Sequence, residues 1–244
     1  MILTNDNKYE ESRRKQLKID EFNSVEHPFM EQLKELGWND DANEVIELKM
    51  QQQPSESFRT SFSEVVLMPK LRKALKQIND FLTDSQIDEV ANRITAYQGG
   101  TLLENNERIF NLLVEGTSVS RNEQTGEQSP SVRYIDFDHP ENNIFTAISQ
   151  FKVAIPGTDH HIIPDIVLFL NGLPIVVVEA KSPKVSEPLS EAIDQLMRYS
   201  EQRGDTGEGN PALFQYNQFL IVTCRNEAKA GTITTHREKY FYRW

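Results

Sequence analysis

The sequence predicts a mixed α/β fold in which helices flank a central sheet. Two apolar runs, residues 166–170 and 175–178, are rich in the side chains typical of strands, and Asn171-Gly172 between them signals a hairpin. Residues 188–202 show helical periodicity and precede a third apolar run at 219–224. A strand, a helix and a strand in succession call for a parallel crossover, so the hairpin and the third run should share one mixed sheet.

The remaining elements are expected to extend this core and to interrupt it once. Residues 25–36 carry a helical apolar stripe that ends at Gly37, and residues 144–154 should form a strand that leads to the hairpin. Between residues 64 and 119, apolar side chains recur at spacings of three and four. This spacing predicts a helical insertion in the α/β core.

Length and composition are those of a globular protein with one large domain. The chain has 244 residues, of which 38% are hydrophobic and 26% are charged. We expect residues 1–244 to form a single domain whose core comprises about 25–50 and 132–244. The net charge of −11 argues against nucleic-acid binding over the whole surface, so any DNA contact must be local or depend on metal or partner subunits.

The sequence shows no signal for a membrane or a secretory route. No apolar run approaches the roughly 20 residues of a spanning helix, and the polar amino terminus lacks the apolar segment of a signal peptide. Cys224 is the only cysteine, which excludes an intrachain disulfide and suits a reducing compartment. We therefore expect a cytoplasmic protein without a membrane partner.

Charged side chains gather at the open end of the predicted hairpin. Asp165 precedes the first strand, and Glu179 and Lys181 end the second. Side chains two residues apart on a strand share a face, so Glu179 and Lys181 should project together. Asp165 joins them only if the connection has three residues, 171–173, because a one-residue change of register moves a side chain to the other face. We therefore expect the three-residue connection.

This set of side chains points to metal-dependent phosphodiester chemistry. Two opposed carboxylates about 5 Å apart raise each other's pKa, so we expect a cation between them. Carboxylates with water and substrate phosphate are the ligands of Mg²⁺, and a neighbouring lysine can offset phosphate charge or orient the attacking water. Pro164-Asp165 followed by Glu179-x-Lys181 is the PD-(D/E)xK pattern of nucleases. The alternative is a strand end whose charges are simply solvated.

Five segments carry a resemblance to a known family. They are IDFDHPENNIFTAISQFKV, PDIVLFLNGLPIVVVEAKSP, the Gln195-x-x-x-Tyr199 pair, FQYNQFLIVTC and GTITTHREKYFYRW. In order and spacing, from about Glu26 to Trp244, the chain resembles the N-terminal nuclease domain of the R (restriction) subunit of type I restriction-modification enzymes. The resemblance implies a restriction-endonuclease-like core of the PD-(D/E)xK kind.

The resemblance also implies roles for the residues at the hairpin end. Asp165 and Glu179 would bind Mg²⁺ or Mn²⁺ together with the Ala180 carbonyl. Lys181 would position the water or the scissile phosphate. Glu26 matches a glutamate on the first helix of related nucleases, and it would complete the metal shell.

Further implications concern DNA and the parent enzyme. Gln195 and Tyr199 share a helical face because they are four residues apart, and they match the family's QxxxY motif, which would orient DNA or the active-site lysine. The family's full subunit carries an ATP-driven translocase after this domain, whereas this sequence contains no GxxxxGK[ST] loop. We therefore expect a fragment, with ATP bound only by a C-terminal helicase motor that is absent from this chain. The expected partners are double-stranded DNA and the methyltransferase (M) and specificity (S) subunits.

The leading hypothesis is a Mg²⁺-dependent endodeoxyribonuclease domain that cuts DNA after translocation, without sequence specificity of its own. One alternative is a non-catalytic DNA-clamping or subunit-docking module whose site is silent without its partners. Another is a stand-alone PD-(D/E)xK repair nuclease, against which the ENNIF and QxxxY segments argue. Metal binding, and cleavage that depends on Lys181, would distinguish the nuclease from the clamp.

Overall fold

A seven-stranded mixed sheet forms the centre of the molecule, in the order β1-β4-β7-β8-β9-β10-β11. The computed structural model describes residues 12–17, 21–40, 42–49, 51–96, 99–122 and 125–243. The strands of the sheet are β1 (Glu44–Ile46), β4 (Phe145–Ser149), β7 (Ile166–Leu170), β8 (Leu173–Ala180), β9 (Phe219–Cys224), β10 (Glu227–Gly231) and β11 (Tyr242–Arg243). β1 is parallel to β4 and β8 is parallel to β9, whereas the other neighbouring pairs are antiparallel. The mixed α/β fold is therefore confirmed, and so is the expected parallel pairing across the crossover.

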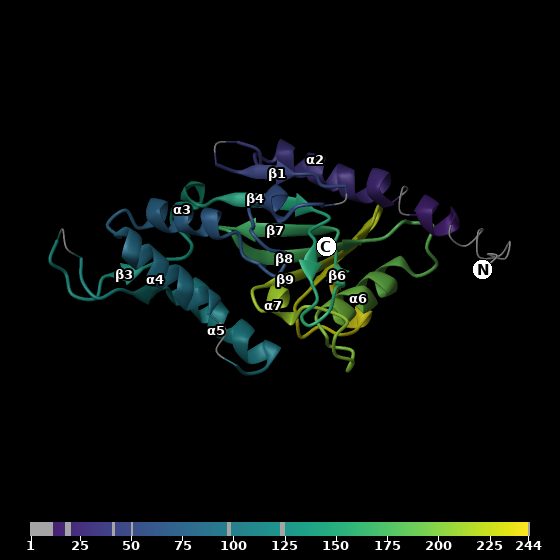
Figure 1. Ribbon diagram of the computed structural model, residues 1–244. Coiled ribbons are helices and arrows are strands. Elements are labelled where there is room, and N and C mark those ends of the chain that lie inside the picture. The colour runs from purple at the N-terminus through teal and green to yellow at the C-terminus, as the bar shows by residue number, and fades with distance from the viewer. Residues whose placement is uncertain are drawn as a thin grey trace.

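Helices cover both faces of the sheet, which explains why β7 is apolar throughout. α2 (His27–Glu35) lies along one face and α6 (Pro188–Tyr199) packs on β8 and β9 (Figure 1). Along β7, Ile166 belongs to the apolar cluster under α2, whereas Val167 belongs to the larger cluster that includes α6. Successive side chains of a strand point to opposite faces, so two covered faces require a continuous apolar run.

Three helices occupy the stretch in which the sequence predicts only helices. They are α3 (Met68–Ile78), α4 (Asp84–Thr95) and α5 (Leu102–Glu115), and they lie together at one end of the sheet (Figure 1). α3 begins against the hairpin turn, where the Leu67 N–H donates a 2.8 Å hydrogen bond to the Gly172 carbonyl. The helices therefore pack at the end of the hairpin opposite to Asp165.

Short elements complete the described chain. They are β2 (Thr117–Ser118), β3 (Ser131–Val132), β5 (Val153–Ala154), β6 (His161–Ile162), α7 (Pro211–Phe214) and 3₁₀ turns at Pro54–Ser57, Pro140–Asn142 and Glu238–Tyr240. The single strand expected over residues 144–154 is wrong, because β4 ends at Ser149 and β5 pairs with β6 instead. Gln150, with a φ of 51°, makes the break. In the described part of the chain, no helix is both long and apolar enough to cross a membrane.

The hairpin turn has two residues, so the predicted three-residue connection is wrong. Leu170 pairs with Leu173, and the residues between them, Asn171 and Gly172, have φ values of 53° and 81°. Positive φ at both positions is the requirement of a type I′ turn, which suits the twist of paired strands.

A β-bulge in β8 supplies the register shift that the turn does not. Phe169 pairs with Pro174, but Leu168 pairs with Val176, which leaves Ile175 as the extra residue. Proline has no N–H, so Pro174 could not donate a hydrogen bond to the neighbouring strand even in regular pairing. The bulge beside Pro174 therefore costs that residue no hydrogen bond. The bulge moves every later residue of β8 to the register that the longer turn was expected to give.

Candidate metal centre

Asp165, Glu179 and Lys181 meet at the open end of the hairpin. Beyond the bulge Ile166 pairs with Val178, and the next residues along the two chains are Asp165 and Glu179. Asp165 Oδ2 accepts a hydrogen bond of 2.8 Å from the Ala180 N–H. The three charged residues are buried, with exposed fractions of 6%, 0% and 5% in chain order. The structure therefore brings together the side chains that the motif predicts.

The Lys181 ammonium group bridges two of the expected metal ligands. Its Nζ donates to Glu179 Oε1 and to the Ala180 carbonyl, each at 3.0 Å. A carbonyl oxygen has two lone pairs, so the Ala180 oxygen retains one for another partner. Glu179 Oε2 is buried and has no hydrogen-bond partner among the described residues. A buried carboxylate oxygen without a donor is costly unless a cation or a shared proton lies against it.

The helix expected over residues 25–36 begins differently and brings a second acidic residue to the site. A π-helical turn, Phe22–Glu26, precedes α2. One carboxylate oxygen from each of Glu21, Glu26 and Asp165 lies within 4.8 Å of the others. Glu21 Oε2 accepts a 3.0 Å hydrogen bond from the N–H of Ser182. The predicted residue Glu26 thus lies at the site, together with Glu21, which the sequence reasoning missed.

Gln150 is a second residue that the sequence reasoning missed. Its Nε2 donates to Glu26 Oε2 at 2.8 Å and approaches Asp165 Oδ1 at 3.5 Å. A continuous strand was expected at this position, and only the break after β4 turns the side chain toward the acidic residues. The one signal in the sequence is a polar residue at the end of an apolar run.

Gln195 and Tyr199 support Glu179 from α6. Gln195 Nε2 donates to Glu179 Oε1 and, at 2.9 Å, to the Tyr199 hydroxyl oxygen. The Tyr199 hydroxyl in turn donates to the Ile163 carbonyl at 3.5 Å. Because they are one helical turn apart, the two side chains form a continuous chain of contacts. That chain restrains Glu179 Oε1, while Oε2 has no hydrogen-bond partner in the part of the chain that the structure describes.

Burial and mutual repulsion raise the pKa of every carboxyl group in this cluster. Burial, and then the charge of Glu179, raise the pKa of Asp165 well above its usual range, and burial raises that of Glu179. Burial and the charge of Asp165 raise the pKa of Glu26 to about 8. Burial raises the pKa of Glu21 to about 7, although the charge of Lys181 opposes the shift. The site therefore retains protons that a metal ion would replace.

The pKa of Lys181 shifts in the direction that keeps its side chain charged. Burial disfavours its protonated form, but the charges of Glu179, Asp165 and Glu21 outweigh burial and raise the pKa of Lys181. The ammonium group is therefore a fixed positive charge at neutral pH. The set as a whole offers carboxylate and carbonyl oxygens, the hard ligands that Mg²⁺ and Mn²⁺ prefer.

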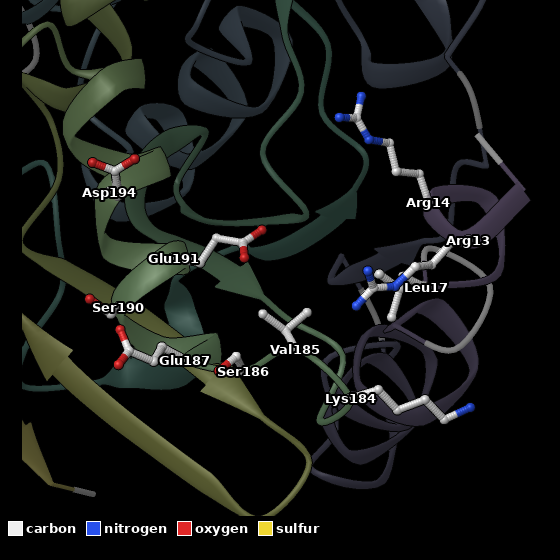
Figure 2. A pocket seen from close by; sticks show the side chains of 10 residues that line it. All are labelled: Arg13, Arg14, Leu17, Lys184, Val185, Ser186, Glu187, Ser190, Glu191 and Asp194. Atoms are coloured by element: carbon white, nitrogen blue, oxygen red, sulfur yellow. The ribbon is translucent and has the colours of Figure 1, made fainter. Parts of the chain in front are cut away.

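A cleft of about 650 Å³ borders the segment that follows Lys181 (Figure 2). Its opposing walls carry opposite charges, with Arg13, Arg14 and Lys184 on one side and Glu187, which precedes α6, and Glu191 and Asp194 of α6 on the other. Neither Asp165 nor Glu179 lines it in the described part of the chain. The cleft therefore adjoins the acidic cluster and is not part of it.

Comparison with known proteins identifies relatives over most of the chain. The chain is 29% identical over 219 residues to the type I restriction enzyme HindI endonuclease subunit of Haemophilus influenzae, which covers 89% of this chain and 20% of that protein. It is 26% identical over 230 residues to the putative type I restriction enzyme MjaIXP endonuclease subunit of Methanocaldococcus jannaschii. That match covers 94% of this chain and 21% of the relative. The chain thus spans about one fifth of the length of these relatives. Residues 18–239 match the family described as "Type I restriction enzyme R protein N terminus", and the chain belongs to that family.

Proposed function

We propose that this chain is a Mg²⁺-dependent endodeoxyribonuclease domain that hydrolyses DNA phosphodiester bonds without sequence specificity of its own. The observation that carries the proposal is the buried group of Asp165, Glu179 and Lys181, in which Glu179 Oε2 has no hydrogen-bond partner among the described residues. Burying two acids together costs free energy, which a structural role alone does not explain.

The contacts of the side chains support a separate role for the metal ligands and for Lys181. Asp165, Glu179 and the Ala180 carbonyl would hold Mg²⁺, and Glu26 would contribute from the Asp165 side. The bound ion would polarise the scissile phosphate and lower the pKa of water. Because the pKa of Lys181 is raised, its charged ammonium group would offset negative charge on the phosphate, and it would not remove a proton from water.

Gln195 and Tyr199 would act as positioning residues. Gln195 contacts Glu179, and Tyr199 contacts Gln195. By restraining Glu179 Oε1, they would keep the other oxygen directed toward the ion. Lys181 Nζ donates to the same oxygen, Glu179 Oε1, so the pair would also help to orient the active-site lysine, as the resemblance implies.

The proposal extends to the fold and to the parent enzyme. The central sheet with the hairpin site supports a restriction-endonuclease-like PD-(D/E)xK core, a single domain with a helical insertion at about 64–119. The relatives are named as type I endonuclease subunits about five times as long as the matched region, which leaves room for an ATP-dependent motor. In that setting the domain would cut double-stranded DNA after translocation, together with methyltransferase and specificity subunits.

The test uses the complete reconstituted enzyme and separates cutting from movement. Lys181→Ala should reduce cleavage of circular DNA by about 100-fold or more, because it removes a buried charge next to the scissile phosphate. Translocation, measured by triplex displacement, should continue at the wild-type rate. Lys184→Ala is the matched control, since Lys184 is three residues away and exposed. Unchanged cleavage in Lys181→Ala would instead support the clamping module.

A further inference from the structure

Arg59 is a buried cation that the proposed reaction does not use. It is 2% exposed, and its hydrogen bonds with the described residues all end on neutral oxygens. Glu64, the acid whose charge acts on Arg59, has its carboxylate oxygens bound to Thr60. Burial lowers the pKa of Arg59 to about 9, so the guanidinium is still charged at neutral pH. A buried charge without an acid against it costs free energy, and its contacts have to explain why it is there.

The Arg59 guanidinium holds the chain just after the break at the end of β4. Its Nη2 donates to the Lys152 carbonyl at 2.8 Å, and its central carbon lies 3.8 Å from the centre of the Phe151 ring. Nη2 also donates to Gln51 Oε1 at 3.0 Å, and that oxygen accepts from the Lys152 N–H at 3.2 Å. Nε and Nη1 donate to two further oxygens within residues 57–64, both at 2.7 Å. A planar guanidinium can supply all these donors and a stacking face at once, which an ammonium group cannot.

The same segment also forms part of the acidic site. The Gln150 N–H donates to the Asp165 carbonyl at 2.7 Å, and the Phe151 N–H donates to the Pro164 carbonyl at 3.1 Å. Gln150 has a φ of 51°, an unfavourable value for a residue other than glycine, so the surrounding structure has to maintain it. The Gln150 side chain donates to Glu26 Oε2 at 2.8 Å and approaches Asp165 Oδ1 at 3.5 Å.

We propose that Arg59 is a positioning residue of the candidate metal centre: by holding residues 151–152, it keeps Gln150 in the conformation that presents its amide to the acidic residues. The inference rests on the proposed function, because it treats the carboxylates that Gln150 contacts as metal ligands. Arg59 would act through the backbone and not through a contact with the ion. The alternative is that Arg59 only anchors the loop at residues 51–64, in which case its loss would lower stability and leave metal binding unchanged.

The Mn²⁺ affinity of the metal-stripped chain tests this role without DNA. Gln150→Ala should weaken Mn²⁺ binding about 10-fold in calorimetric titration, the effect of removing a partner of a metal ligand. Arg59→Lys keeps the positive charge but loses the planar fork, and it should weaken binding about 5–10-fold. The double variant should bind no more weakly than Gln150→Ala alone, because both changes remove the same restraint.

Asn79→Ala is the control for a purely structural loss. Asn79 is 4% exposed, and its side chain donates to the Leu75 and Arg133 carbonyls at 3.0 and 2.9 Å. These contacts join α3 to the segment that follows β3, and they do not involve residues 150–152. The variant should therefore lose stability in urea denaturation and keep the wild-type Mn²⁺ affinity.

Circular dichroism in EDTA checks that each variant is folded. Should Arg59→Lys fail to fold, Gln51→Ala answers the same question, because Gln51 Oε1 accepts from both Arg59 and the Lys152 N–H. Gln51→Ala should weaken Mn²⁺ binding about 3-fold, the effect of one lost hydrogen bond. Combined with Gln150→Ala, it should cause no further loss.

The remaining outcomes separate this inference from the proposed function. Wild-type Mn²⁺ affinity in a folded Arg59→Lys chain, or a double variant in which the two losses multiply, would overturn the positioning role and leave the nuclease proposal standing. Equal weakening in Asn79→Ala would also overturn it, because lost stability alone would then account for the effect. Failure of the wild-type chain to bind Mn²⁺ would instead overturn the proposed metal centre, and this inference with it.

Discussion

Glu26→Gln should stabilise the metal-free protein at neutral pH and not at acid pH. Glu26 is 3% exposed, and burial with the charge of Asp165 raises its pKa from 4.5 to about 8. The folded chain therefore binds this proton more tightly than the unfolded chain, and stability falls as the pH rises from about 4.5 to about 8. At pH 7, about 2.5 pH units above the ordinary pKa, the penalty is up to about 3 kcal/mol at 1.36 kcal/mol per unit.

Glutamine should remove this penalty without losing the local contacts. Its oxygen can still accept from Gln150, and its amide group can donate to Asp165. The expected gain in the free energy of unfolding is thus up to about 3 kcal/mol at pH 7 and near zero at pH 4.5. In saturating Mg²⁺ the order should reverse, since the wild-type carboxylate binds the cation more tightly than the neutral amide does and is stabilised more by it.

Urea denaturation followed by circular dichroism in EDTA, at both pH values, measures the difference directly. Glu35→Gln is the control, because Glu35 is an exposed carboxylate at the end of α2, the helix that follows Glu26, and should show no change at either pH. A Glu26→Gln protein that is equally destabilised at pH 4.5 and pH 7 would refute the reasoning. It would mean that Glu26 stabilises the fold through its contacts and carries no ionisation penalty.

Two further predictions concern the turn and the support of Glu179. Gly172→Ala should destabilise the fold by about 2–3 kcal/mol in urea denaturation, because φ is 81° and the added Cβ would lie 2.5 Å from the Leu67 carbonyl oxygen. Gly126→Ala, with a φ of 75° and no atom within 4 Å of the added Cβ, should cost only about 1 kcal/mol, and equal losses would contradict the packing argument. Gln195→Ala should lower cleavage by the complete enzyme about 10–100-fold with translocation unchanged, since it frees Glu179 to move. An unchanged cleavage rate would show that Glu179 needs no such restraint.

Local sequence patterns were sufficient for the central strands β7, β8 and β9 and for part of the site. The period of two along a strand places Glu179 and Lys181 on one face, and their side chains are in contact at 3.0 Å. The spacing of four places Gln195 beside Tyr199, and the two form a 2.9 Å hydrogen bond. These inferences hold because each depends only on the backbone geometry of one element.

The details that assemble the acidic cluster depend on contacts between distant segments. The bulge at Ile175 places Asp165 opposite Glu179. The Ile175 carbonyl accepts a hydrogen bond from the N–H of Gln218, the residue before β9. The motif predicts that Asp165 shares a face with Glu179, but a type I′ turn with a bulge and a longer turn without one give the same final pairing. The sequence therefore determined that two carboxylates should face each other, and the packing of β8 against β9 decided how.

The amino-terminal side of the site was decided only by the tertiary structure. The apolar stripe of α2 fixes which side of the helix packs on the sheet, but it does not reveal that the preceding turn is wound as a π-helix. Glu21 reaches the cluster through that winding and through the Ser182 N–H, which is 161 residues away in the chain. Periodicity in the sequence reveals only the regular part of a helix or strand. An extra residue, such as one in a π-helical turn or a β-bulge, is stabilised by partners that lie far apart in sequence.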